Sequence, residues 1–161
     1  MTDEAFDRLA EEFFQAWVER FPVLGTALGL HKYDGQLSGN SRAFYEETLD
    51  FTQDMRRRFE KLNVEDLSGS RGLDRDVALY TLDMSAFQLG EIRSWESRSE
   101  GAEDLGGSLF PLFARTFAPF PTRLESMTAR LRAGPSYLDE IESRLSRPVT
   151  LWTEMAIEAA A

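Results

Sequence analysis

The residues best suited to chemistry lie in one short loop, His31-Lys32-Tyr33-Asp34, which places the single histidine of the chain beside a tyrosine and an acid. Two interpretations are open. In the first, His31, Tyr33 and Asp34 line a ligand cleft. In the second, Asp34 makes a side-chain turn while His31 and Tyr33 hold the loop against the rest of the fold. The second is the commoner role for such residues.

A second cluster follows further along, where Arg93, Trp95 and Arg98 lie close together in the sequence. An arginine beside a tryptophan can stack on the indole ring and still offer N–H donors to a carboxylate. A purely structural role is again the simpler interpretation. The candidate cleft-lining residues are therefore His31, Tyr33, Asp34, Arg93 and Trp95.

Catalytic and metal-binding motifs are missing from the sequence. A catalytic zinc site needs three protein ligands, normally with two histidines in a His-Glu-x-x-His run, and a di-iron bundle needs two Glu-x-x-His pairs. One histidine and no cysteine satisfy neither requirement. No Gly-x-Ser-x-Gly elbow or phosphate-binding loop occurs, and adjacent acid pairs are expected by chance among 28 acids. We predict no catalytic residue, no metal ligand and no cofactor in this chain.

The charge and the hydropathy narrow the choice of partners. A net charge of −10 argues against binding to a nucleic-acid backbone, which requires clustered positive charge. No apolar run approaches the roughly 18 residues that span a bilayer, and no signal peptide follows Met1. We expect a cytoplasmic protein, or one from which a leader was removed, with neither nucleic acid nor membrane as partner.

The element expected to organise the fold is a helix within residues 72–95. Its apolar residues occupy two sides: Leu73, Val77, Tyr80, Met84 and Phe87 on one, and Leu79, Leu82, Ala86 and Leu89 on the other. A helix that is apolar on two sides must be covered on both. The sequence predicts an all-α fold, an irregular bundle of six or seven mostly antiparallel helices around this central buried helix, in a single domain over residues 1–161.

Caps and breakers predict the other helices. The first begins at a Thr2 cap and ends before Pro22, and the second runs from a Ser41 cap to about Leu62. A glycine-rich exposed loop is expected over residues 96–107, then a short helix capped by Ser108. Gly134-Pro135 is expected to separate two further helices. A last helix from Val149 ends in three alanines without a cap, as if cut partway, which would leave Trp152 and Met155 uncovered.

Several stretches, in order along the chain, resemble the bacterial family catalogued as domain of unknown function 885. They are the opening helix and residues 26–34, 73–76, 92–96, 117–119 and 149–156. The resemblance implies an α-helical protein related to zinc metallopeptidases, some of which act as carboxypeptidases or dipeptidases. The zinc-binding run of the family, His-Glu-x-x-Pro-Gly-His, lies further downstream and is absent here, so no catalytic or metal residue transfers to this chain.

Two functional hypotheses follow. In the first, the chain is the N-terminal helical portion of a longer peptidase-like protein and forms one wall of a substrate cleft. Zinc and the peptide substrate are then expected only with the full-length parent. In the second, the chain is a stand-alone, non-enzymatic helical module that forms a homodimer or docks a partner through its last helix.

Overall fold

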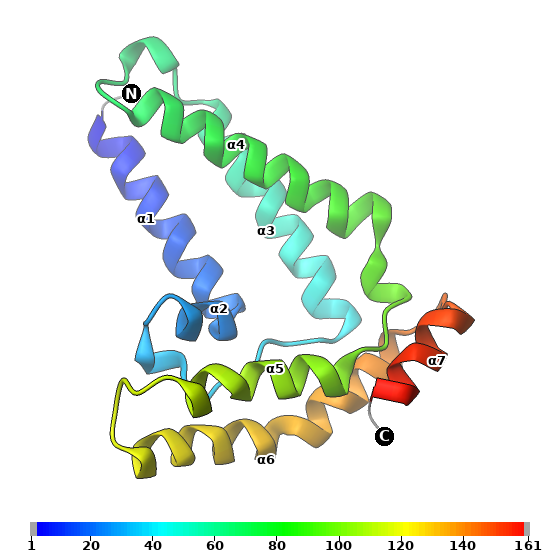
Figure 1. Ribbon diagram of the computed structural model, residues 1–161. Helices are drawn as coiled ribbons and strands as arrows, with labels where there is room; N and C mark the ends of the chain where they lie inside the picture. The colour runs from blue at the N-terminus through cyan, green and yellow to red at the C-terminus, as the bar shows by residue number, and fades with distance from the viewer. Residues whose placement is uncertain (1–2, 160–161) are drawn as a thin grey trace. The chain divides into compact units, whose positions relative to one another are not determined.

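All regular structure in the protein is helical over residues 3–159, the part that the computed structural model describes (Figure 1). This confirms the all-α prediction and the number of helices. No helix in that range is long and apolar enough to cross a bilayer. The helices are α1 Asp3–Arg20, α2 Pro22–Ala27, α3 Arg42–Glu60, α4 Arg71–Phe87, α5 Gly101–Ala114, α6 Phe120–Arg144 and α7 Thr150–Ala159.

The chain forms two compact units, each built from two separate segments. The first unit contains the residues up to Trp17 and Tyr45–Ser94, and therefore most of α1 and α3 together with α4. The second contains Val18–Phe44 and the residues from Trp95 onward, and therefore α2, α5, α6 and α7. The loop with the candidate residues His31, Tyr33 and Asp34 lies in the second unit.

The core of the first unit is aromatic and aliphatic. Phe59 is completely buried, and its ring meets Phe6 and Phe13 edge-on, with centroids 6.2 and 6.1 Å apart. Burying each such side chain stabilises the fold by about 1.5–3 kcal/mol. The buried cluster consists of Phe6, Leu9, Met55, Phe59, Leu62 and Leu82.

The prediction that residues 72–95 form a central buried helix is wrong in one respect. Helix α4 exists, but only one of its two apolar sides is covered, and Leu82 is its single fully buried residue among those described. The other side is exposed, with fractional exposures from 41% for Met84 to 68% for Leu73 and Tyr80. The periodic pattern indicates two apolar sides, but within this chain only one of them packs against other helices.

Several predicted helix ends are confirmed. Ser41 accepts a hydrogen bond from the Phe44 amide, 3.2 Å away, and so caps α3 as expected. Pro22 follows the end of α1 and opens α2, where its missing N–H costs nothing. The predicted cap at Thr2 and the last two alanines, residues 160–161, lie outside the described residues.

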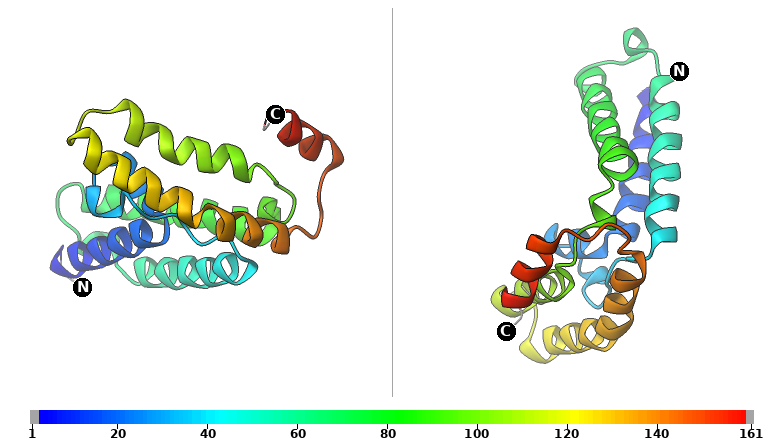
Figure 2. Two further views of the ribbon diagram at one scale, coloured as in Figure 1. Left: turned by 90° about the horizontal axis from the view of Figure 1, so that it is seen from below. Right: turned by 90° about the vertical axis from the view of Figure 1, so that its right-hand side faces the viewer.

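Two predicted helix breaks are absent, because α5 and α6 are each continuous. Helix α5 begins at Gly101, partway through the expected glycine-rich loop, so Ser108 lies inside the helix. Its hydroxyl donates to the Leu105 carbonyl instead of capping the helix. Helix α6 runs through Gly134-Pro135 and bends along its length (Figure 2). An interior glycine costs about 1 kcal/mol and a proline about 3. The two long helices lie side by side and bury Leu112 and Ile141, and this packing outweighs the local preferences.

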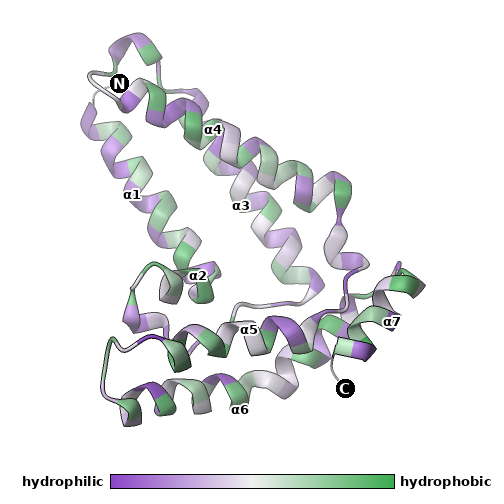
Figure 3. Ribbon diagram, viewed as in Figure 1, coloured by the Kyte–Doolittle hydropathy of each residue, from purple (hydrophilic) through white to green (hydrophobic). Residues whose placement is uncertain are grey.

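Helix α7 carries an uncovered apolar surface, as the sequence predicted. Trp152 is 40% exposed and Met155 59%, and no described residue of α7 is buried. Figure 3 shows apolar residues along α4 and α7 alike. Both helices therefore present apolar side chains to solvent.

Candidate functional site

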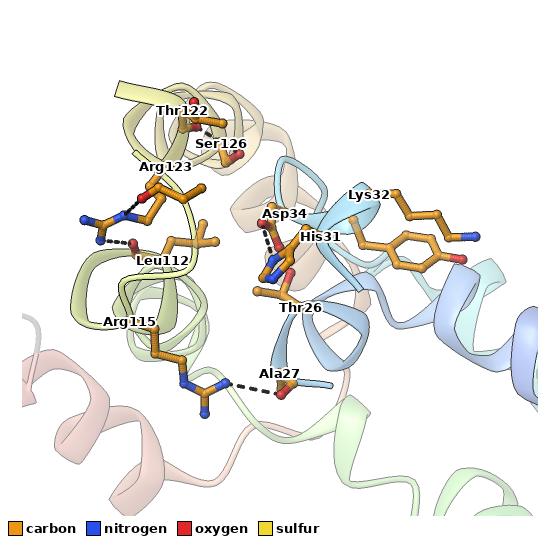
Figure 4. A network of polar contacts seen from close by, with 12 residues as sticks. Thr26, Ala27, His31, Lys32, Asp34, Leu112, Arg115, Thr122, Arg123 and Ser126 are labelled. Carbon is orange, nitrogen blue, oxygen red and sulfur yellow. Dashed lines mark hydrogen bonds and ion pairs between the residues drawn. The ribbon is translucent and has the colours of Figure 1, made fainter. Parts of the chain in front are cut away.

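The loop after α2 owes its shape to a left-handed turn at Gly29, where φ is 83°. The Leu30 amide donates to the Gly25 carbonyl and the Gly29 amide to the Thr26 carbonyl, which closes the end of the helix. The Ala27 carbonyl stays available and accepts a hydrogen bond of 3.2 Å from Arg115 Nη1. In Figure 4, Arg115 reaches from the end of α5 to the end of α2.

His31 is fixed from two directions. Its Nδ1 lies 3.0 Å from Asp34 Oδ2. An ionised carboxylate can only accept hydrogen bonds, so Nδ1 is the donor when Asp34 is ionised. Its ring stacks on Phe117, with centroids 4.0 Å apart and an interplanar angle of 10°. The side chain of His31 is nevertheless 47% exposed. The imidazole is therefore held in one orientation at an accessible surface.

Tyr33 and Asp34 face the interior. Each is only 4% exposed, and the Tyr33 ring lies against Gly25, where even a methyl group would come within 2.5 Å of it. Lys32 Nζ lies 4.8 Å from the Tyr33 ring centroid. Tyr33 thus holds the loop to α2, and Asp34 holds the His31 ring through the hydrogen bond to its Nδ1.

A cavity of about 260 Å³ opens between the α2 end and the α5–α6 connection, beside His31. Arg115 supplies the cation at its rim, and the apolar part comes from Leu28, Pro111 and Phe117. No acidic residue lines the cavity. The remaining lining residues are Thr26, Ala27, Gly29 and His31 itself.

Arg130 lies behind this cavity and is completely buried. Its Nη2 donates to Thr26 Oγ1 at 2.6 Å, and its Nη1 donates to the Ser108 carbonyl. Burial lowers the pKa of the Arg130 guanidinium from its ordinary value, while the negative charge of Asp34 acts in the opposite direction. Arg130 therefore joins α2 and α5 through α6 and provides the charge that balances Asp34.

Arg115, Phe117 and Arg130 were not among the predicted site residues, and only Arg130 belongs to a sequence pattern that marks it. Arg115 is the sole charged residue between Asp104 and Arg123. Arg130 belongs to a series at seven-residue spacing on α6, Arg123, Arg130, Tyr137 and Arg144, and all three arginines are buried and bond backbone carbonyls. A repeat of seven keeps residues on one face of a helix. Arginines at this spacing lie on one face of α6, where Arg123 and Arg130 bond backbone carbonyls of α5.

The other two predicted residues do not line this cavity. Trp95 is 6% exposed in the second unit, and the Arg42 guanidinium lies 5.0 Å from its ring centroid. Arg93 ends a π-helical turn, Gln88–Ile92, of the first unit in the left-handed conformation, with φ of 52°. Such turns are often found at functional sites.

Within residues 3–159, no three side chains of histidine, aspartate or glutamate come together in a group that could hold a metal ion. The oriented imidazole of His31 and the guanidinium of Arg115 are the two ionisable side chains that line the cavity. Together they can bind an anion or exchange a proton with one.

The comparisons with known proteins agree with the helical fold. No curated protein matches the sequence significantly. A solved structure from Shewanella oneidensis, described as "a putative lipoprotein of unknown function", superposes with a TM-score of 0.83 at 22% identity. The match covers 96% of this chain but only 28% of that one, so the chain spans little more than a quarter of its length. The family model described as "Bacterial protein of unknown function (DUF885)" matches residues 22–160. The chain therefore belongs to the DUF885 family of bacterial proteins.

Proposed function

We propose that this chain is the N-terminal helical portion of a longer zinc-dependent peptidase-like or carboxypeptidase-like protein. In that protein it forms one wall of a substrate cleft and supplies no catalytic residue. The single observation that carries the proposal is the bare side of α4, which the periodic pattern marks for burial.

The bare side of α4 consists of Leu73, Val77, Tyr80, Met84 and Phe87, each at least 41% exposed. Large side chains at successive turns of one helix seldom stay in water unless another surface covers them. The Shewanella protein is more than three times as long as the part that this chain matches, so a relative of that length has further chain with which to cover α4.

The zinc ion and the peptide substrate belong to other parts of the proposed protein. With one histidine, this chain cannot supply a His-Glu-x-x-His site, and zinc would act there as a Lewis acid on a peptide carbonyl. The described residues would contribute the cleft wall and the cavity beside His31.

The decisive experiment is to read the coding sequence beyond codon 161 and to produce any longer protein encoded there. We expect a downstream His-Glu-x-x-Pro-Gly-His run, one zinc per molecule and cleavage of peptides by the longer protein. We expect neither zinc nor cleavage with the 161-residue chain. Stoichiometric zinc in the short chain, or a natural stop codon directly after Ala161, would count against the proposal.

A second candidate function is a stand-alone module that self-associates or docks a partner through α7. It is favoured by the exposure of Leu151, Met155 and Ile157, which ranges from 59% to 66%. Sedimentation of the 161-residue chain tests self-association. A concentration-dependent dimer abolished by Met155→Ser and Ile157→Ser favours the self-associating module, whereas a monomer at all concentrations counts against self-association.

The cellular location stays a prediction under either candidate. We propose a cytoplasmic protein, and fractionation of the source bacterium with an antibody against the chain would test this. Recovery in the membrane fraction would contradict it.

A further inference from the structure

We propose that the cavity beside His31 binds the carboxylate of a small apolar organic acid. Arg115 holds the carboxylate, and Leu28, Pro111 and Phe117 contact the apolar part. The acid is either a free molecule or the C-terminal residue of a peptide. The inference does not depend on the proposed peptidase function, because it concerns a site formed wholly within the second unit.

The first argument is the donor capacity of Arg115. Its guanidinium has five N–H donors, and the Ala27 carbonyl takes one of them at 3.2 Å. In the part of the chain that the structure describes, no acid pairs with Arg115, whereas Arg58 and Arg71 each bond a carboxylate with two nitrogens. The bond to Ala27 fixes the guanidinium at the rim without neutralising it. A planar fork held in this way suits a carboxylate.

The second argument is the orientation of His31. Asp34 occupies Nδ1, so Nε2 is the nitrogen that remains for a ligand. The stack on Phe117 limits rotation of the imidazole. Nε2 can accept or donate a single hydrogen bond according to its protonation state, and therefore serves as a second contact for a bound acid.

The third argument distinguishes the kind of anion. The cavity offers one permanent cation, because Arg115 is the single arginine or lysine among its lining residues. A phosphate dianion would require more positive charge than that, whereas a monoanionic carboxylate requires one arginine. The volume of about 260 Å³ lies just below the range of roughly 300–1,000 Å³ for sites of drug-sized ligands, and it suits one apolar side chain with its carboxylate.

The test uses 4-methylpentanoate and its neutral amide, whose shapes are nearly identical, with ligand-observed NMR to follow weak binding to the 161-residue chain. We expect the acid to bind and the amide to bind at least roughly tenfold more weakly, because the amide lacks the charge that Arg115 holds. Arg115→Met should lower affinity for the acid by a similar factor. Arg115 is exposed, so circular dichroism should show an unchanged fold.

Two variants serve as controls. Arg132→Met removes the same charge from an exposed site on α6 and should leave binding unchanged. Phe117→Ala should weaken binding of both probes through loss of the apolar wall. A tripeptide Ala-Ala-Leu with a free carboxylate, compared with its C-terminal amide, identifies the source. Binding of the free form as tight as that of 4-methylpentanoate supports a peptide terminus, and much weaker binding supports a free acid.

Three results would overturn the proposal. One is equal binding of acid and amide, and another is full affinity in the Arg115→Met protein. The third is inorganic phosphate binding as tightly as the acid with the same dependence on Arg115, which would mark a general anion site.

Discussion

Replacing Arg130 by methionine tests how much a buried charge beside the candidate site contributes to the free energy of unfolding. The guanidinium is completely buried and bonds Thr26 Oγ1, the Ser108 carbonyl and, at 3.4 Å, the Tyr33 carbonyl. Methionine keeps the length and the apolar contacts of the side chain while it removes the charge. Asp34, only 4% exposed, then loses the cation that compensates it.

The expected magnitude follows from these contacts. A hydrogen bond from a charged donor contributes about 1.5–3 kcal/mol, and the long bond to Tyr33 adds little. Part of this loss is offset because methionine has no guanidinium to desolvate. Removing one partner of a buried ionic network costs about 3–5 kcal/mol. We therefore expect a loss of about 3 kcal/mol, which corresponds to a fall in Tm of about 6–12 °C for a chain of this size.

The assay is urea and thermal unfolding followed by far-ultraviolet circular dichroism. Arg132→Met, two residues away and exposed, is the matched control and should stay within about 0.5 kcal/mol of the wild type. Adding Asp34→Asn to Arg130→Met should recover about 1 kcal/mol or more, since it removes the unbalanced carboxylate. An Arg130→Met protein as stable as the Arg132→Met control would refute the reasoning.

Three further predictions concern other parts of the chain. Gly25→Ala should cost about 1–3 kcal/mol, since its methyl group would lie 2.5 Å from the Tyr33 ring, whereas Gly106→Ala, with open space around it in α5, should gain about 0.5–1 kcal/mol; urea unfolding of both variants checks the contrast. Arg71 bonds Asp7 with two nitrogens, at 2.8 and 2.9 Å, and holds the pKa of Asp7 below its ordinary value. That contribution is present above about pH 4 and is lost as the pH falls through the lowered pKa, so the stability difference between wild type and Arg71→Met should shrink from pH 7 to pH 2; a difference that grows in acid would contradict it. Leu73→Ser with Tyr80→Ser should leave the free energy of unfolding of this chain within about 0.5 kcal/mol and should reduce binding of a hydrophobic dye, and a large destabilisation would mean that α4 is covered in solution.

The periodic and capped parts of the fold were predictable because they depend on neighbours in sequence. The apolar spacing of α1, α3 and α4 gave their existence, and the hydroxyl of Ser41 and the ring of Pro22 gave their ends. Gly134-Pro135 misled the prediction because local preference favours a break there. The packing of α6 against α5 overrides that preference, and packing partners are not visible in a window of sequence.

The candidate site was predictable only in part. The sequence singled out His31, Tyr33 and Asp34 because their side chains are chemically distinctive and adjacent. It did not indicate Arg115 or Phe117, because more than 80 residues separate them from His31, and a contact over that distance exists only once the chain has folded.

The amino-acid sequence by itself therefore determined the helical class, most helix ends and the two apolar sides of α4, since all of these follow from the 3.6-residue period and from caps. Only the tertiary structure decided which side of α4 is covered and that Arg115 meets the loop of His31. It also decided that the arginines of α6 are buried. These depend on which surfaces pack against each other, and packing joins residues that are distant in the chain.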